Sequence, residues 1–371
     1  MNAGIRLRKS AGAVCLKPVG CPRSACGSRR HAIGAAFRGA GKINAMQVFG
    51  KSAGRTAGCG VSAGWEKDYN GNIRPAHNAG MSRQNGMPEY GKTEPKIGAG
   101  NRTSAGFGKE ADIMVFVRDM NYTPKSENRR LHIYLPDEYD QTNERYSVMY
   151  YFDGHNLFYD SWATYGKSWG LKEFLDQWDK RMIIVGMECG HCGDERLDEY
   201  SPYTMTMLGK NIHGMGEETL QWIRDDIKPM IDGEFRTWPQ REATGIAGSS
   251  MGGLMAVYAG IVYNETFSKM ACLSPAVDSC RKELNRDLRA HTLNPDSRFY
   301  LSLGTEEAGK SYRSRKTGEL LPPPSVRYLY ELSGRLQKKG AMTDVYIQEG
   351  GRHCEADWEK QNRRYMEFLW M

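Results

Sequence analysis

The sequence of 371 residues has no long apolar run, and this absence excludes one class of protein. Charged and polar residues interrupt every stretch of about 18 residues, the length that a membrane-spanning helix requires. Apolar residues still make up 40% of the chain, which is enough to build a core. We therefore expect a soluble, globular protein that does not act in a membrane.

Acidic residues are missing from the first 65 residues, which contain eleven Lys or Arg and no Asp or Glu. The net charge of +7 is therefore a local property of this region. Residues 1–110 also hold 20 of the 42 glycines and few apolar positions at regular spacing. Such a segment buries too little surface to offset its ordering entropy, so we predict that residues 1–110 form a disordered basic extension.

Three interpretations of this extension are open. Its basic residues are typical of a nucleic-acid tether or of an arginine-rich targeting peptide. Alternatively, the segment has no function of its own or precedes the true start, for which Met81 and Met114 are candidates. We favour this last interpretation, and we expect neither nucleic-acid binding nor secretion, because no apolar signal segment follows the basic residues.

The cysteines show no spacing that indicates a disulfide framework or a zinc site. There are nine, an odd number, at irregular intervals. One motif, C-G-H-C at 189–192, is shared with redox enzymes, but a redox cysteine requires a helix N-terminus and this motif precedes an acidic loop. A site made of Cys189, Cys192 and His191 lacks a second ligand pair. We expect free thiols, a cytoplasmic location, and neither a redox role nor a metal.

From Asp112 onwards, strand-like and helix-like segments alternate. Near-continuous apolar strands that alternate with helices predict an α/β fold, with a mostly parallel sheet of about eight strands and helices on both faces. The strands are expected at 112–120, 129–136, 147–154, 181–188, 243–249, 268–274, 298–304 and 343–351. The helices are expected at 168–178, 216–235, 251–263, 279–291, 325–340 and 355–370. Pro229 is expected to bend or divide the second of these helices.

The pentapeptide G-S-S-M-G at 248–252 fits the pattern G-x-S-x-G. It lies between a predicted buried strand and an apolar helix, which is the context of a nucleophile elbow. The sharp turn of an elbow requires small residues at positions 248 and 252, and Gly253 avoids crowding against the sheet. Because the pentapeptide also occurs by chance, its catalytic role depends on whether suitable partners for Ser250 follow in the chain.

A serine hydroxyl is a weak nucleophile, and it requires a histidine that is oriented by a carboxylate. In this fold class the partners follow in the order Ser, Asp or Glu, His, each after a later strand. Glu306 and Glu307 follow the strand at 298–304, and His353 follows the strand at 343–351. These residues are the candidates, although each also fits the description of an ordinary loop residue.

An oxyanion hole needs backbone N–H donors from the residue after the serine and from the loop after an early strand. The first donor is Met251. The loop at 152–158 offers the second, with Gly154 allowing a close approach and His155 donating through its backbone. A simple turn is the alternative interpretation of this loop.

Several motifs, in this order along the chain, resemble the putative esterase family of α/β-hydrolases. This family is related to enterochelin-type esterases, feruloyl esterases and antigen-85-like acyltransferases. The resemblance covers about residues 112–371 and predicts an α/β-hydrolase catalytic domain over residues 111–371. The motifs are YYFDGHNLF, IIVGMECG, RLDEYSPY, IKPMIDGEFRT, GIAGSSMGGLMAVYAG, CLSPA, LSLGTEEAG and GGRHCEADWEK.

The resemblance implies a role for each candidate residue. Ser250 would be the nucleophile and His353 the general base. Glu307 aligns best with the family's acid, which is an Asp in feruloyl-type members, and Glu306 is the alternative. The family uses neither a metal nor an organic cofactor.

We therefore predict a serine carboxylesterase that acts on a small-molecule ester, such as an acylated sugar or a siderophore-like ester. Two alternatives stay open. One is an acyltransferase that uses the same residues, and the other is a non-catalytic binding protein on the same scaffold. Oligomeric state and acyl specificity do not follow from the sequence.

Overall fold

The computed structural model describes residues 65–67, 73–75, 115–207 and 209–371. Strands β1 (Trp65–Lys67) and β2 (Ile73–Pro75) pair in an antiparallel two-stranded sheet. Both fall within the extension that the sequence predicts to be disordered. The rest of that predicted extension lies outside the described residues.

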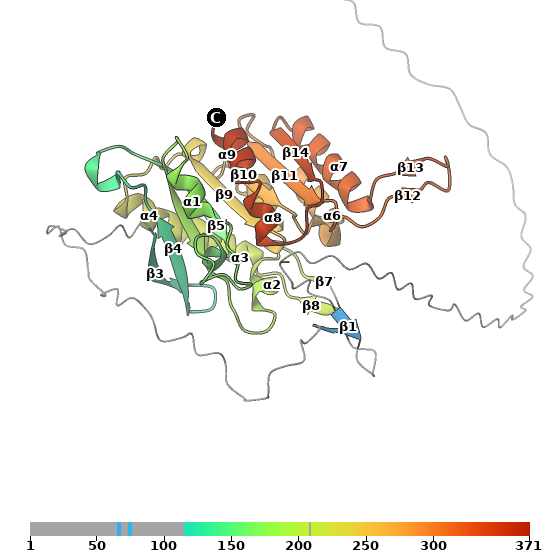
Figure 1. Cartoon of the computed structure of the whole chain (residues 1–371), viewed down its shortest axis with the longest axis horizontal. Helices are drawn as coiled ribbons and strands as arrows, with labels where there is room; N and C mark the ends of the chain where they lie inside the picture. Colours follow the sequence, from blue (N-terminus) through green and yellow to red (C-terminus); the bar gives the residue numbers. More distant parts are fainter. Residues whose placement is uncertain (1–64, 68–72, 76–114, 208) are drawn as a thin grey trace, which may run out of the picture. The chain divides into compact units, whose positions relative to one another are not determined.

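An eight-stranded sheet forms the centre of the larger part of the chain, with β3 at one edge and β14 at the other (Figure 1). Strand β4 is antiparallel to both of its neighbours, and the remaining pairs are parallel. The predicted mostly parallel sheet is thus confirmed. In spatial order the strands are β14 (Met342–Gln348), β11 (Arg298–Gly304), β10 (Lys269–Leu273), β9 (Thr244–Ser249), β5 (Ser147–Phe152), β6 (Met182–Met187), β4 (Glu127–Tyr134) and β3 (Val115–Tyr122).

The α-helices cover both faces of this sheet, because side chains that alternate along each strand enter two separate cores. In β5, Val148, Tyr150 and Phe152 pack in one apolar cluster, and Met149 and Tyr151 pack in the other. Both sets are almost fully buried, which explains why the strands read as continuous apolar runs. The first cluster receives residues of α3 (Gly216–Trp222), α4 (Lys228–Glu234), α5 (Met251–Val262), α6 (Arg281–Ala290) and α7 (Pro324–Lys338). The second receives residues of α1 (Leu171–Asp176), α8 (Glu355–Glu359) and α9 (Asn362–Trp370).

The predicted division of the helix at 216–235 is confirmed. A π-helical turn, Ile223–Ile227, joins α3 to α4, and Pro229 lies in the first turn of α4. Proline has no N–H and its ring collides with the carbonyl four residues earlier, so the helix accommodates it by widening the preceding turn.

The predicted single helix at 355–370 is wrong, because α8 ends at Glu359 and α9 begins at Asn362. The interruption places two buried polar side chains against partners. Gln361 accepts a hydrogen bond from Tyr300 Oη at 2.9 Å, and Asn362 Nδ2 donates to the carbonyl of Trp169 at 2.7 Å.

Two short hairpins and a short helix were not predicted. Their segments of two to five residues are too short to show a periodicity. They are β7 (Met205–Met207) with β8 (Lys210–Ile212), β12 (Tyr312–Arg313) with β13 (Leu320–Leu321), and α2 (Glu195–Glu199). The remaining short elements are 3-10 turns at Tyr139–Gln141, Gly154–Asn156, Arg241–Ala243 and Val277–Cys280.

Two helical glycines provide a matched test of the packing. A Cβ at Gly260 in α5 would lie 2.5 Å from Phe299 Cε1 and 2.7 Å from Met270 Cγ, whereas a Cβ at Gly334 in α7 would meet no atom within 4 Å. We expect Gly260→Ala to lower the free energy of unfolding by about 1–3 kcal/mol through overpacking. Gly334→Ala should raise it by roughly 0.5–1 kcal/mol. Urea unfolding of both variants measures this, and a stabilised Gly260→Ala protein would contradict the close packing of α5 on the sheet.

Candidate active site

Ser250 occupies the turn between β9 and α5, with backbone angles φ 57° and ψ −118°. A non-glycine residue adopts this conformation only when its surroundings impose it. Here the N–H of Ser250 donates to the carbonyl of Leu273 at 3.0 Å, and the N–H of Ala276 donates to the carbonyl of Ser250 at 2.9 Å. The end of β10 and the loop that follows it therefore hold the serine in place.

The glycines around Ser250 are required by close backbone contacts, as predicted from the motif. A Cβ at Gly248 would lie 2.6 Å from the carbonyl carbon of Gly252, and one at Gly252 would lie 2.9 Å from Phe152 Cβ. A Cβ at Gly253 would lie 2.8 Å from the Leu273 carbonyl oxygen. No larger side chain fits these positions unless the turn moves.

Glu307 and His353 follow two adjacent parallel strands, β11 and β14, and the structure brings their side chains together. His353 Nδ1 is hydrogen bonded to Glu307 Oε2. The other carboxylate oxygen accepts hydrogen bonds from the Gly304 N–H at 2.7 Å and from Ser274 Oγ at 2.6 Å. Glu306 is exposed, so of the two glutamates it is Glu307 that contacts the histidine.

Ser250 lies at the same edge of the sheet, because β9, β10, β11 and β14 are consecutive parallel neighbours. The loop after β10 connects the Ser250 turn to the pair of Glu307 and His353, because its Ala276 binds the Ser250 backbone and its Ser274 binds Glu307. Within the part of the chain that the structure describes, no hydrogen bond joins the Ser250 hydroxyl to His353. Such bonds often form only when substrate is present.

Ser274 is a site residue that the sequence analysis missed. It has a positive φ of 43°. Its Oγ donates to Glu307 and accepts a hydrogen bond from Trp358 Nε1 at 3.0 Å. The Trp358 ring in turn meets the His353 ring edge-on, with the ring centres 5.1 Å apart. A serine that follows the parallel strand next to β9, the strand that precedes Ser250, is the signal that could have identified it.

Asp357 fixes the loop that carries His353. Its carboxylate accepts hydrogen bonds from the backbone N–H and the Nε of Arg352, at 3.0 and 2.9 Å, and from Lys360 Nζ at 2.5 Å. Burial alone would raise the pKa of this carboxyl, but the hydrogen bonds from Lys360 and Arg352 outweigh it and lower the pKa to about 2.

The two predicted oxyanion donors follow paired strands, β9 and β5. Met251 is the first residue of α5, so its N–H has no acceptor within the helix. Gly154 and His155 lie in the 3-10 turn Gly154–Asn156 directly after β5. A Cβ at Gly154 would lie 2.4 Å from the carbonyl carbon of Gly186, so only glycine lets this loop pass so closely against β6.

An ion pair between the buried Asp153 and the partly buried Arg196 anchors this loop, and the sequence analysis did not predict it. Asp153 has a positive φ of 59°, and its two carboxylate oxygens bind Arg196 Nε at 2.6 Å and Nη2 at 2.7 Å. Burial would raise the pKa of Asp153, but the charge and hydrogen bonds of Arg196 lower it. The Asp153 N–H also donates to Tyr200 Oη at 3.1 Å.

The two cysteines of the C-G-H-C motif lack the environment of redox-active thiols. Cys189 is buried, and burial raises the pKa of its thiol well above the ordinary value. A reactive thiol requires the opposite shift. Cys192 is exposed, and both are free thiols. This arrangement agrees with the expectation that the motif has no redox role.

His191 of the same motif points instead towards two other residues. His155, Glu188 and His191 each offer one ligand atom, and these atoms lie within 4.8 Å of one another. They are the three described side chains that could together hold a metal ion.

The order of the strands, with β4 antiparallel and a serine at the turn after β9, defines an α/β-hydrolase. The chain matches the model of the family described as "Putative esterase" over residues 125–364. The protein therefore belongs to this esterase family, as the motifs predicted. Membership supports ester hydrolysis as the class of reaction.

The chain is also similar to individual proteins in sequence or in fold. The chain is 25% identical over 253 residues to the protein YbbA of Bacillus subtilis (strain 168). This match covers 66% of this chain and 94% of YbbA. Its fold is similar to that of the BES protein from Bacillus cereus, with a TM-score of 0.52, 17% identity and coverage of 72% and 99% of the two chains. The siderophore hydrolase EstA from Aspergillus nidulans gives a TM-score of 0.53, 15% identity and coverage of 72% and 99%.

The pKa of Asp357 makes stability depend on pH. The carboxyl has a pKa of about 2 in the folded chain and about 3.9 when unfolded, so its contribution of about 2.5 kcal/mol is complete above about pH 5 and is lost as the pH falls through about 2. We expect Asp357→Asn to reduce the free energy of unfolding at pH 7 by about that amount, and by less at pH 3. Urea unfolding monitored by tryptophan fluorescence measures both values.

The control for this experiment is Asp225→Asn. Asp225 forms an exposed ion pair with its neighbour Arg224, so its replacement should change stability by less than about 0.5 kcal/mol. An equal loss of stability in Asp357→Asn at pH 7 and pH 3 would show that the ionised carboxylate does not stabilise the loop.

Proposed function

We propose that this protein is a serine carboxylesterase that hydrolyses a small-molecule ester with Ser250 as nucleophile, His353 as general base and Glu307 as the acid. The observation that carries the proposal is the hydrogen bond between Glu307 and His353 at the sheet edge where Ser250 occupies its strained turn. Family membership supplies independent support for the reaction class.

The hydrogen bond to Glu307 selects the tautomer of His353. When Nδ1 carries the proton and donates it to the carboxylate, Nε2 presents a lone pair. Nε2 then takes the proton of Ser250 as the serine oxygen attacks the ester carbonyl. The carboxylate of Glu307 stabilises the imidazolium that forms.

The oxyanion of the tetrahedral intermediate would bind the N–H groups of Met251 and His155. Met251 begins α5, whose N-terminal end carries a partial positive charge that favours an anion. Loss of one donor of this kind typically costs roughly a hundred- to a thousandfold in rate. As the intermediate collapses, the imidazolium protonates the departing alcohol. Water, deprotonated by His353, then releases the acid from the acyl-enzyme.

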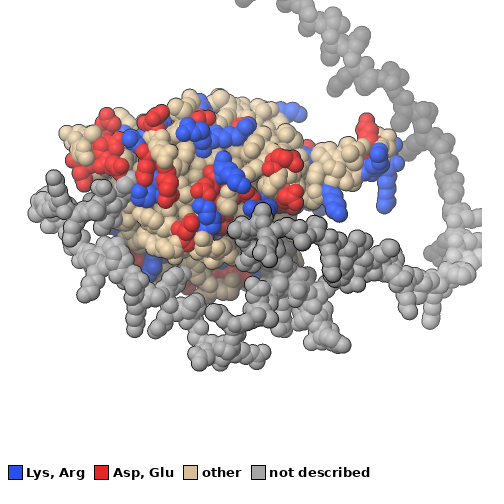
Figure 2. Space-filling view, in the orientation of Figure 1, with Lys and Arg blue, Asp and Glu red and all other residues tan. Residues whose placement is uncertain are grey.

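The substrate that fits the proposed carboxylesterase activity is a small ester, either an acylated sugar or a siderophore-like ester. The siderophore hydrolase that shares the fold supports the second of these classes. Figure 2 shows that, on this face of the described part, acidic and basic side chains are interspersed without an extended patch of either sign. A strongly charged polymer is thus not favoured as a substrate on this face.

Replacement of the nucleophile tests the proposal directly. We expect Ser250→Ala to abolish both labelling by a fluorophosphonate probe and hydrolysis of p-nitrophenyl esters, because no other hydroxyl occupies the turn. The adjacent Ser249→Ala variant is the matched control and should keep both activities. Labelling that persists in Ser250→Ala would exclude Ser250, and an unlabelled wild-type chain would favour a non-catalytic binding protein.

The two glutamates after β11 provide a second test. Glu307→Gln should lower kcat by about 10²–10⁴-fold, since the amide favours the wrong histidine tautomer. Glu306→Gln should leave kcat within about twofold of wild type, because that side chain is exposed and does not contact His353. Steady-state kinetics on p-nitrophenyl acetate distinguish the two, and a larger loss in Glu306→Gln would reassign the acid.

A further inference from the structure

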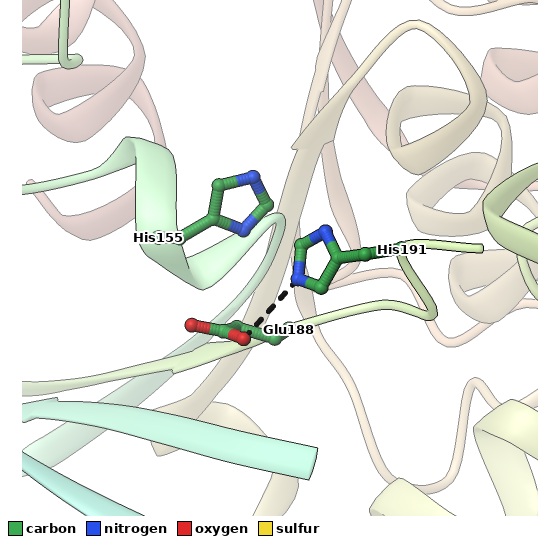
Figure 3. A group of neighbouring side chains, drawn as sticks. All are labelled: His155, Glu188 and His191. Carbon is green, nitrogen blue, oxygen red and sulfur yellow. Dashed lines mark hydrogen bonds and ion pairs between the residues drawn. The ribbon is translucent and has the colours of Figure 1, made fainter. Parts of the chain in front are cut away.

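Three side chains converge where the loop after β5 meets the loop after β6 (Figure 3). His155 comes from the 3-10 turn after β5, and Glu188 and His191 come from the loop after β6. Their ligand atoms lie within 4.8 Å of one another, and His191 Nε2 is 3.2 Å from Glu188 Oε2. Because β5 and β6 are paired parallel strands, the cluster lies at their carboxyl ends.

One nitrogen of this cluster has no partner. The His155 side chain is about nine-tenths buried, and its Nε2 is hydrogen bonded to Thr164 Oγ1 at 2.9 Å. Its Nδ1 is shielded from solvent and has no hydrogen-bond partner among the described residues. Figure 3 shows this ring edge facing Glu188 and His191. A buried polar atom left unpaired is destabilising, and a bound ligand would relieve this.

The protonation states of His155 and Glu188 also suit a cation. Burial lowers the pKa of His155, so its ring is neutral at pH 7 and Nδ1 is able to present a lone pair. Burial would raise the pKa of Glu188, but hydrogen bonds with His132 and His191 lower it and keep the carboxylate charged. The hydrogen bond with Glu188 raises the pKa of His191, so this imidazole gives up a proton when it binds the ion. The site then combines two imidazoles with one anionic oxygen.

We propose that His155 Nδ1, Glu188 Oε2 and His191 Nε2 form a binding site for a divalent late first-row metal ion, of which zinc is the best fit. Two histidines and one carboxylate are a known ligand set for zinc, with a fourth position left for water. The site differs from the cysteine-based one that the sequence analysis rejected, and it departs from the expectation of no metal. His155 and Glu188 are brought together by strand pairing that the sequence does not display.

The surroundings supply the supporting contacts that metal ligands require. Glu188 Oε1 binds His132 Nε2 at 2.6 Å, and Thr164 orients the His155 ring through Nε2. Neighbouring ligands of tetrahedral zinc lie about 3.4 Å apart, given bonds of about 2.0–2.1 Å, so binding requires a small inward shift. His191 has a half-exposed side chain on a loop and is free to make that shift.

A bound ion would tie the loop that carries His155 to the loop after β6. The proposal does not rest on the esterase assignment, because its readout is metal binding. The probe is Co²⁺, which replaces zinc and reports its ligands by visible absorption. The full chain is first freed of metal with EDTA, and the bound Co²⁺ is then measured by titration and by equilibrium dialysis.

We expect the wild-type chain to bind one equivalent more Co²⁺ than His191→Ala, with the visible band of a tetrahedral site and no sulfur-to-cobalt band. Glu188→Gln should show the same loss. The control variants His213→Ala, at an exposed histidine outside the cluster, and Cys192→Ser should bind as wild type does. Circular dichroism of each metal-free variant establishes that it is folded.

Three outcomes would overturn the proposal. These are equal Co²⁺ stoichiometry in the wild type and His191→Ala, a sulfur-to-cobalt band that Cys192→Ser removes, and binding that does not weaken as the pH falls. The last follows because the imidazole of His191 must lose its proton before it binds a metal.

Discussion

Close backbone contact at the carboxyl edge of the sheet is the constraint on which the site depends. Strands β5, β9 and β10 are each followed by a non-glycine residue with positive φ: Asp153, Ser250 and Ser274. Each such residue costs about 1–3 kcal/mol, and it persists only where its neighbours leave no alternative. Here the neighbours are glycine backbones and buried strands, so the rigidity of the sheet is what positions Ser250 and the loop after β5.

Much of the fold could be predicted because its signals are local. The alternation of buried strands and amphipathic helices lies in consecutive residues, and so does the turn that presents Ser250. Glu307 and His353 could be predicted from the sequence for a related reason. In a parallel sheet, the residues that follow successive strands meet at one edge, so position in the chain indicates position in space.

The remainder depends on tertiary neighbours. Asp153 binds Arg196, 43 residues away, and no spacing connects them. Ser274 received no role because its partner Glu307 belongs to the next strand's loop. The break between α8 and α9 has a similar origin, since the side chains of Gln361 and Asn362 at the break bind distant buried groups. In each case a polar side chain is explained by an atom that becomes its neighbour only after the sheet has assembled.

The order of the elements along the chain has a consequence for biosynthesis. Helices α8 and α9 come after all eight strands, yet Tyr365, Met366 and Leu369 complete the core on one face of the sheet. His353 is also translated late. A nascent polypeptide still emerging from the ribosome therefore displays an uncovered apolar sheet surface, and the pair of His353 and Glu307 forms only as that surface closes.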